Sequence, residues 1–465
     1  MSDEKDIGFY VGFIASSFSF AQFITSVWWG YLSDRVGRRP VLLLGLIGTS
    51  VTMVFFGFSH SLAWAIASRA ACGLLNGNIG VAKCVLGEIT DSTNQAQAFS
   101  MFGLNFGIGL IIGPMLGGFL SYPTKTFPGL FGGIQLLEDN PFLLPCVISA
   151  AVSLVGFIVG FFYLPETSRR VLAKELTHQS EPEDRFSTND DEERAPLISS
   201  GNETAIDLWE EMETPEAPRR SVSPDRQSRV SSIYEVDDSP GIGWPAVGSV
   251  VAYGMICFQS IIFDEVFPIW AVSLPPFGLG FAPYDIGICM SVMGFFTLFN
   301  QLLIYPWIAA RVNVLTQYRI ATPFYILSYS MFPFISSLVA IHSEQNSLKW
   351  WCVLSAMAFR FFINVNAFTP VMILVSNSAK LGQLGFVNGL GQAFASFLRA
   401  VGPALGGSLW AWSIQSNLPF PLDDKFIFVF MSAIASLTAL HAWFLLPDSV
   451  GKPGRNASAH SAVEI

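Results

Sequence analysis

The sequence predicts an all-α polytopic membrane protein, and three observations lead to that fold class. Of the 465 residues, 51% are hydrophobic and only 13% are charged, about half the share that is usual in soluble domains. Apolar runs of about 20 residues recur along the chain, which is the length that crosses a hydrocarbon core of roughly 30 Å. The runs are continuous rather than alternating, so they indicate helices and not the strands of a barrel.

Eleven such runs can be recognised. Their approximate limits are 8–30, 41–59, 62–87, 96–120, 141–164, 244–272, 284–308, 320–341, 350–376, 386–411 and 426–446. They divide the chain into an N-terminal bundle (1–167), a polar linker (168–241), a C-terminal bundle (242–448) and a tail (449–465).

Charges in the loops between these runs set the expected orientation. One side carries Arg35, Arg38, Arg39, Arg311, Arg319 and Lys380, whereas the other carries Lys125, Lys349 and Lys425. By the positive-inside rule the first side is cytoplasmic. The linker and the tail are then cytoplasmic as well.

An internal repeat relates the two bundles. The run GPMLGG at 113–118 returns as GPALGG at 402–407, and LPET at 164–167 returns as LPDS at 446–449. Five runs precede the linker and six follow it, while two halves of six spans each are a common plan of membrane proteins. We therefore expect the first half to lack its first helix, because of a gene model begun at a downstream Met or because of a short isoform.

The net charge of −10 is concentrated in the linker, where 18 acidic residues face 9 basic ones. That composition favours disorder.

The linker also contains a possible sorting signal. Glu193, Leu197 and Ile198 have the spacing of an acidic dileucine signal, which predicts a sorting adaptor as partner. It favours a vacuolar or lysosome-like membrane over the plasma membrane. The alternative is a solvated tether in which the pattern arises by chance.

A glycine- and arginine-rich loop, GYLSDRVGRRP, occupies residues 30–40. Gly30 and Gly37 are expected to permit a tight turn between two helices. Asp34 can bind the N-terminus of a neighbouring helix, and its basic neighbours Arg35, Arg38 and Arg39 can form ion pairs that hold a closed conformation. The alternative is that the arginines only set the topology.

Two further motifs lie inside the predicted spans. Arg69 is followed by small residues four apart, which permits close helix approach, while the buried cation needs a partner. Its role could be functional or a structural ion pair. The second motif pairs a Gly-Pro step with glycines on either side, and it predicts bending or glycine packing; its members are Gly109, Gly113, Pro114, Gly117 and Gly118.

These motifs resemble those of the major facilitator superfamily of transporters. The 30–40 loop resembles the signature loop between helices 2 and 3, and the Gly109–Gly118 motif resembles that of the antiporter branches. Other stretches, including EVFPIWA at 265–271, look like zinc-induced facilitator-like and tetracycline-efflux-like transporters. The resemblance implies a major facilitator fold of two six-helix bundles, a cytoplasmic latch in the 30–40 loop and proton-coupled antiport.

Polar groups inside the spans are candidates for binding substrate or protons, because they are costly there without a partner. An apolar setting could keep Asp264 or Glu265 protonated until it is exposed, and Glu265 is preferred; either could instead be an interfacial carboxylate. Lys83 could snorkel to the interface, and Arg399 could pair with a carbonyl freed by Pro403. The candidates are Arg69, Lys83, Gln259, Asp264, Glu265, Asn364 and Arg399.

The function that follows is secondary active export or sequestration of a small organic molecule or metal chelate in exchange for protons, by a monomer in a lipid bilayer. The alternatives are a non-transporting sensor and an inactive truncated product. No enzyme is expected, because the sequence has no phosphate-binding glycine-lysine loop and no ATP-binding domain. No cofactor or metal is predicted from the five histidines, and no basic stripe suggests nucleic acid.

Overall fold

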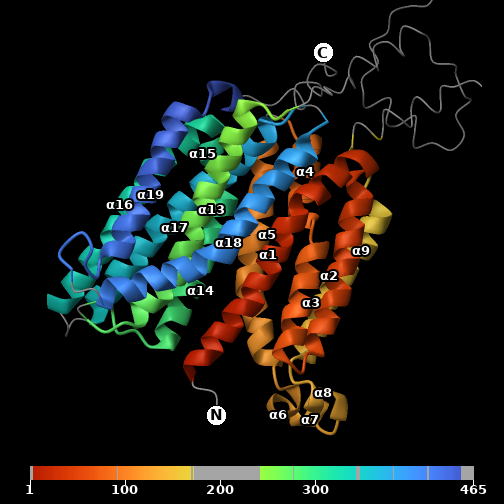
Figure 1. Cartoon of the computed structure of the whole chain (residues 1–465), viewed down its shortest axis with the longest axis horizontal. Helices are drawn as coiled ribbons and strands as arrows, with labels where there is room; N and C mark the ends of the chain where they lie inside the picture. Colours follow the sequence, from red (N-terminus) through yellow and green to blue (C-terminus); the bar gives the residue numbers. More distant parts are fainter. Residues whose placement is uncertain are drawn as a thin grey trace, which may run out of the picture.

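The computed structural model describes residues 4–91, 93–168, 171, 241–275, 277–341, 346–380, 382–415 and 418–451. Long helices run side by side along one axis, and the described residues contain no strand (Figure 1). The linker residues that carry the sorting pattern and the end of the tail lie outside the described ranges. The all-α fold class predicted from the sequence is confirmed.

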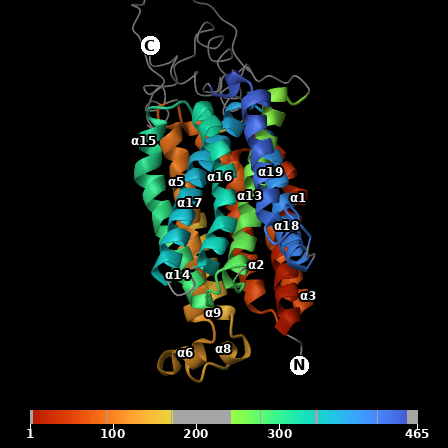
Figure 2. The same ribbon diagram turned by 90° about the vertical axis from the view of Figure 1, so that its left-hand side faces the viewer.

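The first half consists of a row of long helices and three short ones. The long helices are α1 (Glu4–Val36), α2 (Arg38–Gly57), α3 (Leu62–Leu75), α4 (Asn78–Ile89), α5 (Gln95–Leu120) and α9 (Leu143–Tyr163). The short helices α6 (Pro123–Thr126), α7 (Pro128–Phe131) and α8 (Gln135–Asp139) form a lobe at the end where α5 finishes and α9 begins (Figures 1 and 2).

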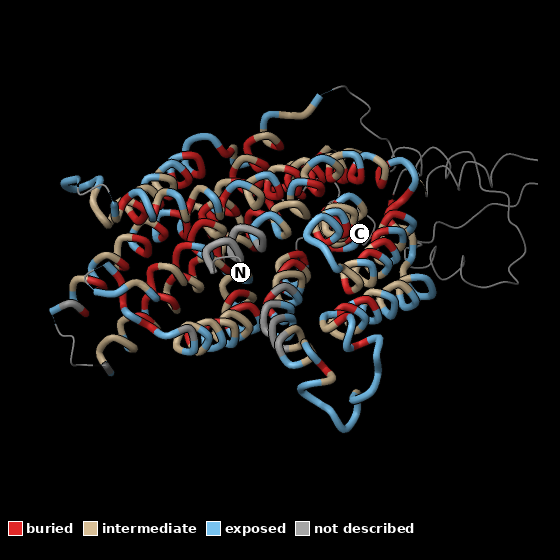
Figure 3. Tube along the Cα trace, turned by 60° about the horizontal axis from the view of Figure 1, so that its bottom comes forward, coloured by how far each residue is buried: buried red, intermediate tan, exposed pale blue. Residues whose placement is uncertain are grey.

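The second half repeats the pattern with longer helices. It contains α13 (Trp244–Val272), α14 (Pro283–Phe299), η1 (Asn300–Ile304), α15 (Tyr305–Ala309), α16 (Val314–Ile341), α17 (Asn346–Asn377), α18 (Leu384–Gln415), α19 (Phe426–Leu440), η2 (His441–Leu445) and η3 (Asp448–Gly451). Buried and exposed residues alternate along much of the helical trace (Figure 3), whereas α17 is buried on all sides from Val371 to Ser376.

Every predicted span coincides with helical structure. Seven helical segments of the described chain are long and apolar enough to cross a membrane. The other four expected spans fall on α1, α5, α16 and α18, which have 26 to 33 residues. The count of eleven spans stays a prediction.

The expected span at 62–87 is two helices rather than one, because the chain breaks at Asn76 and Gly77. The carbonyls freed by the break have partners on α1. The indole of Trp29 donates to the Leu74 carbonyl over 2.7 Å, and Gln22 donates to the Asn76 carbonyl over 3.3 Å. These bonds make a broken helix tolerable where water is scarce.

The two halves meet most closely where α1 crosses α18. A methyl group on Gly30 would overlap the Gly385 carbonyl oxygen, and one on Gly389 would lie 2.7 Å from that of Ser26. Gly30 therefore permits a helix crossing and not the predicted turn, because α1 continues through it to Val36. Gly37, with φ 117°, makes the turn.

The glycine repeats of the two halves have different surroundings. A methyl group on Gly402 would lie 2.7 Å from Cγ2 of Ile261 on α13, and one on Gly406 would lie 3.3 Å from Cγ2 of Val266. Around their counterparts Gly113 and Gly117 on α5, no described atom lies within 4 Å of an added methyl group. Within the described residues, close glycine packing at this repeat therefore exists only in the second half.

Candidate functional site

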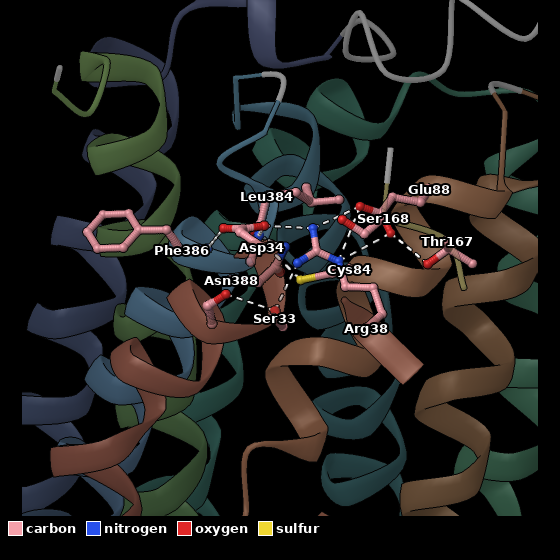
Figure 4. Close-up of polar contacts among 12 residues, drawn as sticks. Ser33, Asp34, Arg38, Cys84, Glu88, Thr167, Ser168, Leu384, Phe386 and Asn388 are labelled. Atoms are coloured by element: carbon pink, nitrogen blue, oxygen red, sulfur yellow. Dashed lines mark hydrogen bonds and ion pairs between the residues drawn. The ribbon is translucent and has the colours of Figure 1, made fainter. Parts of the chain in front are cut away.

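The 30–40 loop of the first half contacts the start of α18 (Figure 4). Asp34 accepts hydrogen bonds from the backbone N–H groups of Gly385 (2.9 Å) and Phe386 (2.8 Å). Both amides belong to the first turn of α18, where orphan N–H groups and the helix dipole favour a carboxylate. The carboxylate itself is buried.

Arg38 connects this contact to α4. Its Nη2 atom lies 2.7 Å from Oδ1 of Asp34 and 2.8 Å from Oε1 of Glu88, and its Nη1 atom donates to Oγ of Ser33 over 2.8 Å. The guanidinium is 2% exposed. One buried cation thus serves two carboxylates, and the amides of α18 help to balance the remaining negative charge.

The last residues of the first half, just before the linker, attach to the same network. Thr167 donates to Oε2 of Glu88 over 2.7 Å, while Glu166 accepts from the backbone N–H of Arg38 (2.7 Å) and Arg39 (3.1 Å). Glu166 therefore provides acceptors for the first turn of α2. Because Glu88 and Glu166 come from distant parts of the chain, the 30–40 pattern could not show that they participate.

The three arginines of the 30–40 loop make different contacts, although the sequence pattern predicted the same role for all three. Only Arg38 makes an ion pair within 4.0 Å among the described residues. Arg35 lies over the ring of Tyr31, and Arg39 donates to the Phe161 carbonyl. The expectation of ion pairs is wrong for Arg35 and Arg39, whose positions suit the topological alternative.

A second polar site lies between the halves at Lys83. Lys83 lies on α4 and is 3% exposed. Its ammonium donates to the hydroxyl of Tyr253 on α13 over 2.8 Å and lies 3.5 Å from Oε1 of Gln392 on α18. Its Nζ atom also lies 4.3 Å from the centroid of the Tyr253 ring. The ammonium is enclosed, so the snorkelling alternative is wrong.

Lys83 has no carboxylate within 4.0 Å among the described residues. The nearby charge that acts on it is Arg399, which is also positive. No hydrogen bond from Arg399 to a described carbonyl is present, so its expected pairing with a carbonyl freed by Pro403 is wrong.

Gln22 extends the network by accepting from Ser396 (2.8 Å) and Gln392 (3.4 Å). The gap next to Lys83 is too narrow to hold a water molecule, and it is lined by Lys83, Tyr253, Met372, Val375, Asn388 and Gly391.

The remaining candidates do not join this site. Gln259 donates to Thr438 on α19 over 2.7 Å, inside the second half. Asn364 accepts from Ser260 over 3.0 Å, also within the second half. Asp264 and Glu265 are exposed on α13 and make no hydrogen bond or ion pair with a described residue.

Arg69 lies on α3, where its guanidinium faces aromatic rings. The Cζ atom is 5.2 Å from the ring centroid of Phe18 and 5.6 Å from that of Phe56. No described carboxylate lies within 4.0 Å, which excludes the structural ion pair within that part of the chain. Gly73, one turn later, packs against α1, because a methyl group there would overlap the Phe18 carbonyl oxygen.

Comparison with known proteins decides the family. The sequence model of the Major Facilitator Superfamily matches residues 5–403. The chain belongs to this superfamily. It is 32% identical to the multidrug transporter mfsB of Aspergillus fumigatus over 452 residues, covering 89% of this chain and 73% of that protein. It is 30% identical to ZINC INDUCED FACILITATOR-LIKE 1 of Arabidopsis thaliana, covering 93% and 82%.

Solved structures of major facilitators share the arrangement of helices. The proton:xylose symporter XylE, bound to 6-bromo-6-deoxy-D-glucose, superposes with a TM-score of 0.67 at 13% identity, covering 98% of this chain and 90% of XylE. As a major facilitator, the chain is an integral multi-pass membrane protein of a transporter family. The expected resemblance to zinc-induced facilitator-like proteins is confirmed.

Proposed function

We propose that the protein is a proton-coupled antiporter that exports or sequesters a small organic molecule or its metal chelate by alternating access. The observation that carries the proposal is the buried contact of Lys83 on α4 with Tyr253 on α13. Alternating access moves one half against the other. A hydrogen bond between the halves must then break and form again in each cycle.

Burial makes this contact suitable for coupling. An ammonium in a membrane interior is costly without an opposite charge, and Lys83 has only neutral acceptors within bonding distance among the described residues. When the halves separate, the ammonium becomes accessible to a substrate, to water or to a proton acceptor. Its state can therefore depend on which side of the membrane is open.

The 30–40 loop supports the same cycle. Asp34 bonds to the first turn of α18 only while the two halves lie together at this end. We propose that Asp34, Arg38 and Glu88 form a latch that stabilises a conformation closed toward the cytoplasm. Antiport rather than symport rests on the resemblance of the Gly109–Gly118 motif.

Glu265 and Asp264 are the proposed proton carriers. Both are exposed on α13 and have no cation within 4.0 Å among the described residues, so neither is committed to a structural ion pair. A carboxylate without such a pair can exchange a proton with the solution on the open side.

The test uses the 465-residue chain in vesicles with an imposed pH gradient and tetracycline as the probe. An acidic interior should drive tetracycline accumulation, with counter-movement of protons reported by a pH-sensitive dye. Glu265→Gln should leave tetracycline exchange without a gradient intact but abolish accumulation, and Asp285→Asn is the matched control on α14. Accumulation by Glu265→Gln that still follows the gradient would remove Glu265 from the mechanism.

A further inference from the structure

A second buried cation, Arg360 on α17, lies in the interior of the second half. Its guanidinium is 1% exposed and is surrounded by aromatic rings. The Cζ atom lies 4.7 Å from the ring centroid of Phe263, 5.2 Å from that of Tyr325 and 5.6 Å from that of Tyr329. No described carboxylate lies within 4.0 Å of it.

Three helices supply the polar residues of this cluster at intervals of one turn, so that each pair shares a helix face. The pairs are Ser260 and Asp264 on α13, Tyr325 and Tyr329 on α16, and Arg360 and Asn364 on α17. Together with Phe263 these residues are called the Arg360 cluster. Ser260 and Tyr325 both donate to Oδ1 of Asn364, over 3.0 and 2.9 Å.

The hydrogen bonds of the cluster leave donors without acceptors. Among the described residues, Nε of Arg360 and the hydroxyl of Tyr329 are buried and make no hydrogen bond within 3.5 Å, although the two side chains interact with each other. Nη2 of Arg360 makes only a long contact of 3.5 Å with Oγ of Ser260. Because Ser260 and Tyr325 already use the acceptor of Asn364, its amide group contributes further donor capacity. Unused donors around a buried cation are complementary to an anion.

The nearest internal anion does not occupy this position. Asp264 interacts electrostatically with Arg360 and with Glu265 but makes no ion pair within 4.0 Å. Its side chain is exposed and Asn364 is half-buried, whereas Arg360 is buried. Asp264 and Asn364 therefore form the open margin of the cluster, and the guanidinium forms its closed end.

We propose that the Arg360 cluster binds the carboxylate of an organic anion. The anion enters past Asp264 and Asn364 and packs its flat apolar part against the rings of Phe263, Tyr325 and Tyr329, which are buried until it binds. Arg360 and Tyr329 donate to the carboxylate. Asp264 repels it and limits its affinity. The proposal rests on the transport function proposed above and names the class of molecule that is carried.

The test is binding to the purified chain in detergent without any gradient, so that it is independent of coupling. The probe is 1-naphthoate. The comparison ligands are 1-naphthylmethylamine and 1-naphthylmethanol, which have the same ring system but a different charge. Dissociation constants come from the rise of Tm with concentration. Naphthoate should bind at least about tenfold more tightly than the alcohol, since one bond to a charged group contributes that much.

Variants separate this site from others. Arg360→Gln should abolish naphthoate binding, Tyr329→Phe should weaken it about tenfold while keeping the ring, and Asp264→Asn should strengthen it. Arg311→Gln, which removes an exposed charge elsewhere in the second half, should change nothing. Because Arg360→Gln could fail to fold, the proposal is decided by Tyr329→Phe and Asp264→Asn, which should change the affinity for naphthoate in opposite directions.

Three outcomes would overturn the proposal. Tighter binding of the amine would make Asp264 a cation site instead. Loss of naphthoate binding in Lys83→Met, with retention in Tyr329→Phe, would place the anion at Lys83. A lower Tm of Asp264→Asn without tighter naphthoate binding would make Asp264 a structural counter-ion. Failure of pH-driven transport with intact naphthoate binding would count against antiport and leave this site standing.

Discussion

The ammonium of Lys83 and the hydroxyl of Tyr253 lie 2.8 Å apart, although they belong to different halves of the protein. Lys83→Met should reduce pH-driven accumulation at least tenfold, since it removes a charge-assisted hydrogen bond of roughly 1.5–3 kcal/mol. Tyr253→Phe should cost less, because the ring face 4.3 Å from the ammonium remains. Vesicle transport measures both variants, and unchanged accumulation by Lys83→Met would refute the coupling role of the contact.

Cys84 offers a reporter for the contact at the 30–40 loop. Its thiol is fully buried on α4, donates to the Gly80 carbonyl over 3.1 Å and lies 3.5 Å from the Leu384 carbonyl at the start of α18. In a chain whose other five cysteines are alanine, Asp34→Asn should raise the rate of maleimide labelling about tenfold or more. The reason is that Asp34 accepts two bonds from α18, each roughly 1.5–3 kcal/mol for a charged acceptor.

The control for this labelling is Asp423→Asn, in the loop at the far end of α18, which should not change the rate. Equal rates of Cys84 labelling in the Asp34→Asn variant and in the chain that keeps Asp34 would show that Asp34 does not hold the halves together. Faster labelling in both variants would instead indicate a general loss of stability.

The glycine repeat gives a matched pair of substitutions. Gly402→Ala should destabilise the chain by about 1–3 kcal/mol, because its methyl group would lie 2.7 Å from Ile261. Gly113→Ala should carry no packing cost, since no described atom lies within 4 Å. Thermal unfolding in detergent compares the two variants, and equal losses of Tm would show that packing does not explain the difference.

The linker pattern makes a prediction about location. A fluorescently tagged chain should reach a vacuolar or lysosome-like membrane, and Leu197→Ala with Ile198→Ala should move it to the plasma membrane. Ser199→Ala with Ser200→Ala, next to the pattern, is the control. If the double apolar variant stays where the unaltered chain is, the pattern is not a sorting signal.

Hydropathy was sufficient to predict the helices, because a membrane span must be long, apolar and helical. It did not predict the break at Asn76 and Gly77, because the apolar run continues through those residues. The break is tolerated since Trp29 and Gln22, on another helix, provide donors for the freed carbonyls. Local sequence contains no information about such partners.

The candidate site was predictable only in part, for the same reason. A carboxylate in the 30–40 loop suggested a helix N-terminus, and Asp34 does contact one, but the helix is α18, 351 residues away. Lys83 was recognised as a polar residue in an apolar span. Its partner Tyr253 was not, because a tyrosine in a span is unremarkable until the fold brings it to a cation.

Lys83 and Arg360 each place a positive charge in the membrane interior without a described carboxylate within 4.0 Å. A movement that carries such a charge across the bilayer does electrical work of about 2.3 kcal/mol per elementary charge for each 100 mV. Under the proposed alternating-access cycle, the resting voltage of the host membrane would bias which side of the protein is open. An anionic cargo would remove part of that bias for as long as it stayed bound.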